Sequence, residues 1–226
     1  MNSQERVLVV GFFLVAMAAT AGAQMGMRGG TPQFHGVWSP VVGQGAAYEM
    51  QTKSGLNTSM EIAVVGKESV GGKDGYWFEM AMSNPRMPGQ MVTKSLTVLD
   101  GGSVTVSRVI VQMPGGPPME MPAQMPQMQH QNQSGDVRKE ADDLGSESVT
   151  TPAGTFACEH YRLKDGSGDS WVSKTASPYG LVKFQGKDST MVVTKLLTDV
   201  KDKITGTPQP FNPMMMMGQP PARPQQ

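Results

Sequence analysis

The alternation of apolar and polar positions predicts a series of short β-strands from residue 34 to about residue 112. Residues 76–80 are rich in aromatic side chains, and residues 103–111 place Val104, Val106 and Ile110 at alternate positions. Both patterns favour strands over helices. Residues 71–75 contain three glycines, which tolerate the positive φ angles of a tight turn. We therefore expect residues 61–67 and 76–82 to pair as a hairpin.

A second group of strand-like segments follows in the last third of the chain. Turn residues at 164–168 and 185–188 separate them, which predicts an antiparallel meander. The strands are expected at residues 155–164, 169–174, 181–185 and 190–197. The charged stretch before them, residues 136–143, is compatible with either a short helix or the polar start of a strand.

Two segments have a composition that does not favour a core. Residues 113–135 consist mostly of Met, Pro, Gln and Gly, and residues 201–226 end in a similar mixture. Repeated prolines remove backbone donors, and glutamines bury little apolar area. We expect a long disordered insert at 113–135 and a disordered tail at 201–226.

The fold class that follows is mainly β, with one β domain over residues 34–200. Many short strands with almost no helix must curl or stack to bury one face. We expect a single curved antiparallel sheet, half-barrel or barrel-like. Its aromatic residues either fill a solid core or line a ligand cavity. The candidates for such a cavity are Trp77, Phe78, Phe156, Tyr161, Trp171 and Phe184.

The start of the chain is typical of a secretory signal peptide. An apolar run at residues 7–19 follows Arg6 and precedes Ala21-Gly22-Ala23, a small-x-small cleavage pattern. The run is shorter than the ~20 residues that span a bilayer. We expect a signal peptide at residues 1–23, a flexible leader at 24–33, and a soluble exported protein, periplasmic or extracellular, without a transmembrane anchor.

Composition narrows the classes of partner. The chain has 19 basic and 19 acidic residues, and no basic cluster dense enough to neutralise a row of phosphates. Nucleic acid is therefore not an expected partner. The sequence contains 1 cysteine, so no internal disulfide forms. Nothing in the sequence indicates an oligomeric state.

Few residues suggest catalysis. Cys158 and His160 lie two apart on an expected strand and so share a face. Such a pair suits a nucleophile or half of a metal site, although a buried cysteine more commonly packs as a small hydrophobe. Asp142, Asp143 and Glu147 are carboxylates without an evident cleft, and no Gly-x-Ser-x-Gly motif is present. We expect no enzymatic activity and no catalytic residue.

Methionine is unusually frequent, at 20 residues. Thioethers prefer soft ions such as Cu(I) or Ag(I). The flexible insert therefore suggests a Cu(I) site, although Met-rich low-complexity sequence also occurs without a role. The candidate ligands are Met113, Met119, Met121, Met125, Met128 and His130.

Residues 151–156 read Thr-Pro-Ala-Gly-Thr-Phe, Trp171 lies in a later strand, and residues 180–184 read Gly-Leu-Val-Lys-Phe. This order resembles uncharacterised exported bacterial β-rich domains, some of which are similar to lipoprotein-carrier half-barrels. The resemblance covers about residues 151–195 and implies a curved antiparallel sheet with one apolar concave face. It implies no catalytic residue.

Together these patterns favour a non-enzymatic exported protein that binds an apolar ligand, such as a lipid or acyl chain. A curved sheet with an apolar face suits a chain-like ligand. Two alternatives remain open: a periplasmic Cu(I)-binding protein that uses its Met-rich loop, and a structural or surface interaction module with a solid core.

Overall fold

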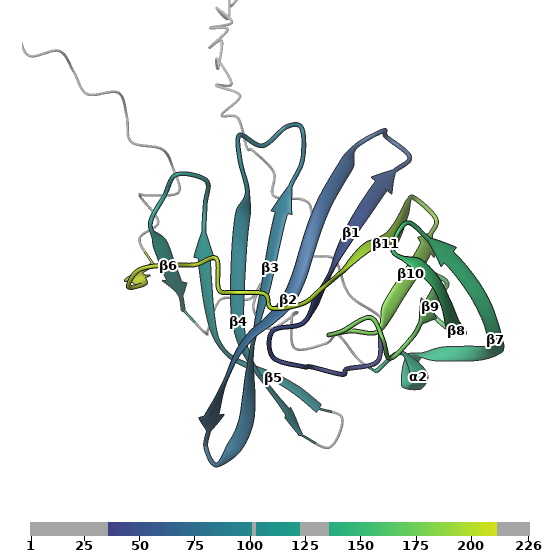
Figure 1. Cartoon of the computed structure of the whole chain (residues 1–226), viewed down its shortest axis with the longest axis horizontal. Coiled ribbons are helices and arrows are strands. Elements are labelled where there is room, and N and C mark those ends of the chain that lie inside the picture. Colours follow the sequence, from purple (N-terminus) through teal and green to yellow (C-terminus); the bar gives the residue numbers. More distant parts are fainter. Residues whose placement is uncertain (1–35, 101–102, 123–135, 212–226) are drawn as a thin grey trace, which may run out of the picture. The chain divides into compact units, whose positions relative to one another are not determined.

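The computed structural model describes residues 36–100, 103–122 and 136–211, in which nearly all regular structure is β (Figure 1). One 12-stranded sheet contains every strand of these ranges. The first half of the sheet is formed by β1 (Gly45–Thr52), β2 (Asn57–Val70), β3 (Lys73–Ser83), β4 (Met91–Asp100), β5 (Ser103–Gln112) and β6 (Pro118–Met121). The second half is formed by β7 (Ala141–Thr151), β8 (Gly154–Leu163), β9 (Gly168–Val172), β10 (Leu181–Gly186) and β11 (Ser189–Leu197), and β12 (Gln209–Pro210) is a short edge strand.

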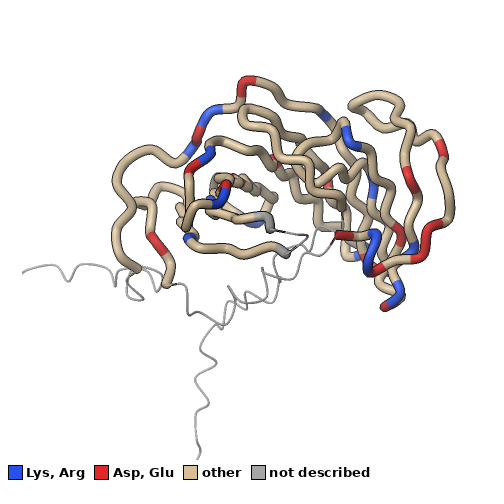
Figure 2. Tube along the Cα trace, turned by 90° about the horizontal axis from the view of Figure 1, so that it is seen from below, with Lys and Arg blue, Asp and Glu red and all other residues tan. Residues whose placement is uncertain are grey.

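The strand order is β12-β6-β5-β4-β3-β2-β1-β11-β10-β9-β8-β7, so the sheet has two ends and does not close. Neighbouring strands are antiparallel, apart from the parallel pair of β12 and β6. Figures 1 and 2 show the strands bending round rather than lying flat. The prediction of a mainly β, curved antiparallel sheet is confirmed.

Both predicted strand pairings are present. β2 pairs with β3 through a turn at Gly71 and Gly72, whose φ angles are 57° and 80°. These angles suit glycine because it lacks a Cβ atom. The run from β8 to β11 forms the expected antiparallel meander.

The structure differs from the expected disorder at two places. Within the Met-rich insert, Pro118–Met121 forms β6 and pairs with β5. Proline is compatible with this position because it is the first residue of its strand. In the predicted tail, Ile204 is buried and Gln209 pairs with Met119. Apolar contacts and backbone pairing therefore order parts of two segments that composition alone marks as unstructured.

The remaining parts of the insert and tail, residues 123–135 and 212–226, lie outside the described residues. The predicted signal peptide and leader, residues 1–33, lie outside them as well.

The charged stretch before β7 contains both of its possible structures. Asp136 accepts a hydrogen bond from the backbone N–H of Arg138 and caps the short helix α2 (Val137–Glu140), and Ala141 then begins β7. Val137 is fully buried beside Tyr161 and Leu163. One apolar side chain thus anchors an otherwise charged turn. None of the helices in the described ranges has the length and hydropathy of a membrane span.

Residues 198–204, which follow β11, cross the sheet and cover part of one face of β2–β4. Ile204 packs with Trp77 and Leu96 in a buried cluster. The carboxylate of Glu79, only 2% exposed, accepts hydrogen bonds from the backbone N–H groups of Lys203 and Ile204. Orphan backbone donors at the segment are thereby paired with a buried acceptor.

The buried carboxylate of Glu79 belongs to a small charged group. Burial, and then a hydrogen bond with the Asp202 carboxyl group, raises the pKa of Glu79 to about 7. Burial acts in the same direction on Asp202, but hydrogen bonds from Lys94 and Glu79 lower its pKa overall. Lys94 forms an ion pair with Asp202 and also lies 4.8 Å from the centre of the Trp77 ring. The segment is therefore held by one proton shared between two carboxyl groups and by a neighbouring ammonium.

This arrangement predicts how stability depends on pH. Because the pKa of Glu79 is raised on folding, its stabilising contribution is complete below about pH 4.5 and is lost as pH rises through about 7. The free energy of unfolding of the native protein should fall by up to about 3 kcal/mol more over this window than that of Glu79→Gln, whose neutral amide resembles the protonated acid. Urea denaturation at a series of pH values measures the difference. The control is Glu61→Gln, which removes the surface partner of Lys203 and should keep the native slope; identical slopes for Glu79→Gln and the native protein would contradict the assignment.

Candidate functional site

The strands β1–β6 have one face that is rich in methionine and, over the rows from Met82 to Phe78, carries no charged side chain. In an antiparallel sheet, residues directly opposite one another project to the same face, as do residues two apart on one strand. By this rule every methionine in the strands that the structure describes lies on the same face of the sheet. They are Met50, Met60, Met80, Met82, Met91, Met119, Met121 and Met191.

Two rows of cross-strand partners define this face. In the first row, Met60 of β2 is opposite Met82 of β3, which is opposite Met91 of β4. In the second row, Met80 is followed by Thr93, Val111 and Met119. We call these two rows, the next row, which contains Phe78, and the adjoining Met50 of β1 the methionine face. Its residues are Tyr48, Met50, Met60, Ile62, Val64, Phe78, Met80, Met82, Met91, Thr93, Ser95, Val109, Val111, Met119 and Met121.

Beside these rows, the charged residues of the same strands project to the opposite face, and the Lys67–Asp74 ion pair lies on the methionine side only farther along β2 and β3. Glu61 and Glu79 alternate with methionines and project away from them, as does Lys94. The 198–204 segment covers part of this charged face through its contacts to Glu79 and Glu61. Charge alternation of this kind is typical of antiparallel sheets that bury one face.

The methionine face is partly open. Met60 and Met119 are buried, whereas Met50, Met80, Met82, Met91 and Met121 are only partly so. At the edge of the face, Phe78 packs against Trp38 and Tyr179, with ring centroids 5.0 and 5.9 Å away. The flexible thioether side chains of methionine fill irregular space and adapt to different ligands. The face therefore offers an adaptable apolar surface.

A small hollow lies beside the same strands. It has a volume of about 140 Å³, and its lining includes Glu49, Glu61, Ser59 and Ser83. Small-molecule sites usually measure ~300–1,000 Å³ and are mostly apolar. This hollow is smaller and more polar than such a site.

The six aromatic cavity candidates do not share one lining. Phe78 lies on the methionine face, and its neighbour Trp77 lies on the opposite face by strand alternation. Phe156 and Trp171 belong to the main core cluster, and Tyr161 belongs to the cluster around Val137. Phe184 is partly buried against both of these clusters. The structure thus distributes these residues among separate packed groups.

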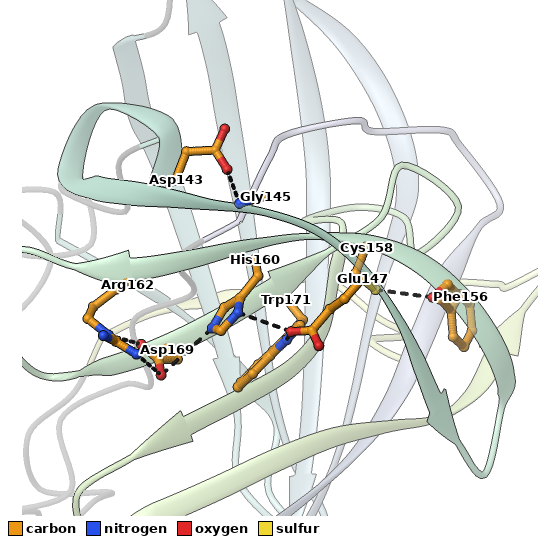
Figure 3. A network of polar contacts seen from close by, with 9 residues as sticks. All are labelled: Asp143, Gly145, Glu147, Phe156, Cys158, His160, Arg162, Asp169 and Trp171. Atoms are coloured by element: carbon orange, nitrogen blue, oxygen red, sulfur yellow. Dashed lines mark hydrogen bonds and ion pairs between the residues drawn. The ribbon is translucent and has the colours of Figure 1, made fainter.

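A polar network lies on β7, β8 and β9 around His160 (Figure 3). Glu147 of β7 accepts a hydrogen bond from the Trp171 indole Nε1–H, and its Oε1 lies 3.0 Å from Nδ1 of His160. The imidazole stacks on the Trp171 ring, with centroids 4.3 Å apart and planes inclined by 18°. Lys183 of β10 places its Nζ 4.4 Å from the centre of the same ring. The indole is therefore held by its neighbours on both adjacent strands.

The far side of the His160 ring faces a second carboxylate. Nε2 lies 3.7 Å from Oδ2 of Asp169 and forms no hydrogen bond, although the atom is buried. Asp169 in turn accepts two hydrogen bonds from the Arg162 guanidinium, at 2.9 and 3.3 Å. These hydrogen bonds, and burial acting against them, leave the pKa of Asp169 below its ordinary value. The network ties three strands together and presents no activated nucleophile.

Cys158 is adjacent to this network, but its thiol is not activated as a nucleophile. The thiol is buried in the main core cluster and donates weakly to the carbonyl oxygen of Phe156, 3.7 Å away. Burial, and then the nearby Glu147 carboxylate, raises the pKa of Cys158 to about 11. A nucleophilic cysteine needs a lowered pKa. The geometry therefore favours the packing role for Cys158 over the catalytic one.

Metal-ligand groupings can be assessed only where side chains are described. In those ranges no cluster of three or more His, Cys, Asp or Glu residues is arranged to hold a metal ion. Of the predicted Cu(I) ligands, Met119 and Met121 lie on β6 and Met113 follows β5. The other three, Met125, Met128 and His130, lie outside the described residues. The proposed loop site stays a prediction.

Comparisons with known proteins give little further information. No protein family model matches the chain, and no curated protein matches it. Among solved structures, the chain is similar to a candidate lipoprotein from Parabacteroides distasonis, with 15% identity, a TM-score of 0.34, and coverage of 74% of this chain and 99% of that one. It is also similar to a candidate exported protein with a YmcC-like fold from Bacteroides fragilis, with 13% identity, a TM-score of 0.35, and coverage of 71% and 99%. At these TM-scores the similarity supports no inference about this chain.

Sequence reasoning missed the methionine face, although part of its signal was present. Met80 and Met82 alternate with Glu79 and Ala81 in the strand that was expected at residues 76–82. The alignment of Met60, Met82 and Met91 depends on the register between strands, which the spacing within one strand does not contain.

The state of Cys158 gives a prediction. Because its pKa is raised to about 11, alkylation by iodoacetamide at pH 8 should be at least ~100-fold slower in the folded protein than in the protein unfolded in urea. Mass spectrometry of timed samples measures both rates. Comparable rates in the two states would show that the thiol is exposed and ionised, and would contradict the packing role.

Proposed function

We propose that the protein is an exported, non-enzymatic binding protein that holds an apolar chain, such as the acyl chain of a lipid, against the methionine face. The observation that carries this proposal is the partial exposure of an uncharged, methionine-rich area on β1–β6. Large contiguous apolar areas that reach the solvent commonly mark binding surfaces.

The chemistry of the face favours a flexible apolar ligand. In the rows from Met82 to Phe78 no charged side chain projects to the methionine face, so this area offers no partner for an anionic or cationic group. Each methylene group that leaves water contributes about 0.8 kcal/mol. A chain with ten buried methylenes would therefore gain roughly 8 kcal/mol before the cost of its immobilisation.

The dimensions of the face suit an extended chain. Neighbouring strands are about 4.8 Å apart, so the path across β1–β6 measures roughly 24 Å. The methionines along this path have three rotatable side-chain bonds each and can repack around chains of different length. We therefore expect affinity for a class of acyl chains rather than for one lipid.

The network around His160 supports a structural role in this proposal. Its carboxylates are occupied by Trp171, Arg162 and His160, and the thiol of Cys158 is raised in pKa by burial. These contacts connect β7, β8 and β9 to one another. The proposal accordingly assigns no residue to catalysis.

Placing a charge on the methionine face tests the proposal. Met82→Lys should weaken binding of a fluorescent fatty acid at least tenfold, because an ammonium is costly to desolvate under an apolar chain. Titration of the delipidated protein measures the affinity. The matched control is Ser83→Lys, since Ser83 is the next residue of β3 and projects to the other face; it should bind as the native protein does.

Circular dichroism must show that both variants are folded. If Met82→Lys does not fold, Met82→Glu and Met80→Lys test the same face by the same titration. Native protein that binds no fatty acid, or equal affinity for folded variants of the two faces, would contradict the proposal. Native mass spectrometry of protein purified from its own host provides an independent readout, because a bound lipid adds its mass.

A further inference from the structure

Three methionines form an in-register row on three adjacent strands. Met60, Met82 and Met91 are direct cross-strand partners on β2, β3 and β4. The register is regular here, since the β2–β3 irregularity lies at Val64–Gly66. The three thioethers are therefore placed on one face in one line by backbone pairing.

The spacing of the row allows the three sulfur atoms to converge. The outer strands β2 and β4 lie about 10 Å apart, with β3 midway between them. Met60 and Met91 each lie about one strand spacing from Met82, so their side chains need only a small tilt toward it to share one ion. A methionine side chain has three rotatable bonds, so rotamer changes alone can supply this tilt.

The chemical surroundings select the type of ion. The ligands are neutral thioethers, which prefer soft monovalent Cu(I) and Ag(I) over hard cations. The methionine face carries no carboxylate that would favour Ca²⁺ or Mg²⁺, because Glu61 and Glu79 project to the other side.

Access and charge are also compatible with a monovalent ion. Met60 is 1% exposed, and it forms the inner end of the row. Met82 and Met91 are partly exposed and leave one side of the row open to solvent. A single positive charge at this boundary is less costly than one in a closed core.

We infer that Met60, Met82 and Met91 form a three-thioether site for Cu(I), for which Ag(I) can substitute. This site differs from the Met-rich insert, because its ligands lie on paired strands and none belongs to residues 113–135. It also goes beyond acyl-chain binding, because the ion binds to protein that holds no lipid.

Methyl NMR with Ag(I) tests the site in the full mature chain. Protein labelled at the methionine methyl groups is delipidated and titrated with silver nitrate in chloride-free buffer. The resonances of Met60, Met82 and Met91, assigned by single Met→Leu variants, should move together with the first equivalent of Ag(I). Movement of other methionines first, with these three unchanged, would overturn the inference.

Competition for Cu(I) with a coloured chelator gives the affinity under anaerobic conditions. Met82→Leu/Met91→Leu should weaken the tightest Cu(I) site at least tenfold, because only one of three thioethers remains. Leucine conserves volume closely enough to retain the fold. The matched control, Met119→Leu/Met121→Leu, removes two methionines from the other end of the same face and should retain the native affinity.

Equal affinity for the two double variants, or no Cu(I) capture by the native protein, would refute the site. These outcomes are separate from those of the fatty-acid titration. Loss of silver binding leaves acyl-chain binding untouched, and a failed fatty-acid titration leaves the Met60, Met82 and Met91 resonances free to respond to Ag(I).

Discussion

The two-residue period of the β-strand, fixed in register across β1–β6, is the constraint on which the other features depend. On β3 this period sends Met80 and Met82 to one face and Glu79 and Ala81 to the other. A slip of one residue would reverse every one of these positions. The same few strands therefore carry the methionine face on one side and charged residues such as Glu79, Glu61 and Lys94 on the other, and different groups pack on the two sides.

The charged face is completed by the chain itself. The segment after β11 brings the backbone donors of Lys203 and Ile204 to Glu79, while Ile204 enters an apolar cluster with Trp77. On the methionine face, Met82 packs against the main core cluster, and Met82 and Met91 both stay partly exposed. Both proposed ligands suit the methionine face. An apolar chain would contact its apolar area, and a soft cation would bind the sulfur atoms of the row of Met60, Met82 and Met91.

The sequence was informative where a signal is local. The β2–β3 hairpin and the meander from β8 to β11 follow from strand alternation and from turn residues such as Gly71 and Gly72. Composition was less informative, because β6 forms inside a segment of Met, Pro and Gly through pairing with β5. The candidate site depends on contacts between distant residues. Neither the row of Met60, Met82 and Met91 nor the approach of Glu147 to His160 can be read from spacing along one strand, since both require the cross-strand register and a bulge in β7.

The central claim is that the methionine face is the surface that receives a ligand. Oxidation by dilute hydrogen peroxide, followed by peptide mass spectrometry, gives the rate of sulfoxide formation at each methionine. This rate reports the exposure of the thioether, because access of peroxide controls the reaction. In the lipid-free protein Met82 and Met91 should oxidise faster than buried Met60, and a saturated fatty acid should slow them several-fold while Met87, in the β3–β4 turn, keeps its rate. Unchanged rates at Met82 and Met91 with the fatty acid bound would contradict the account.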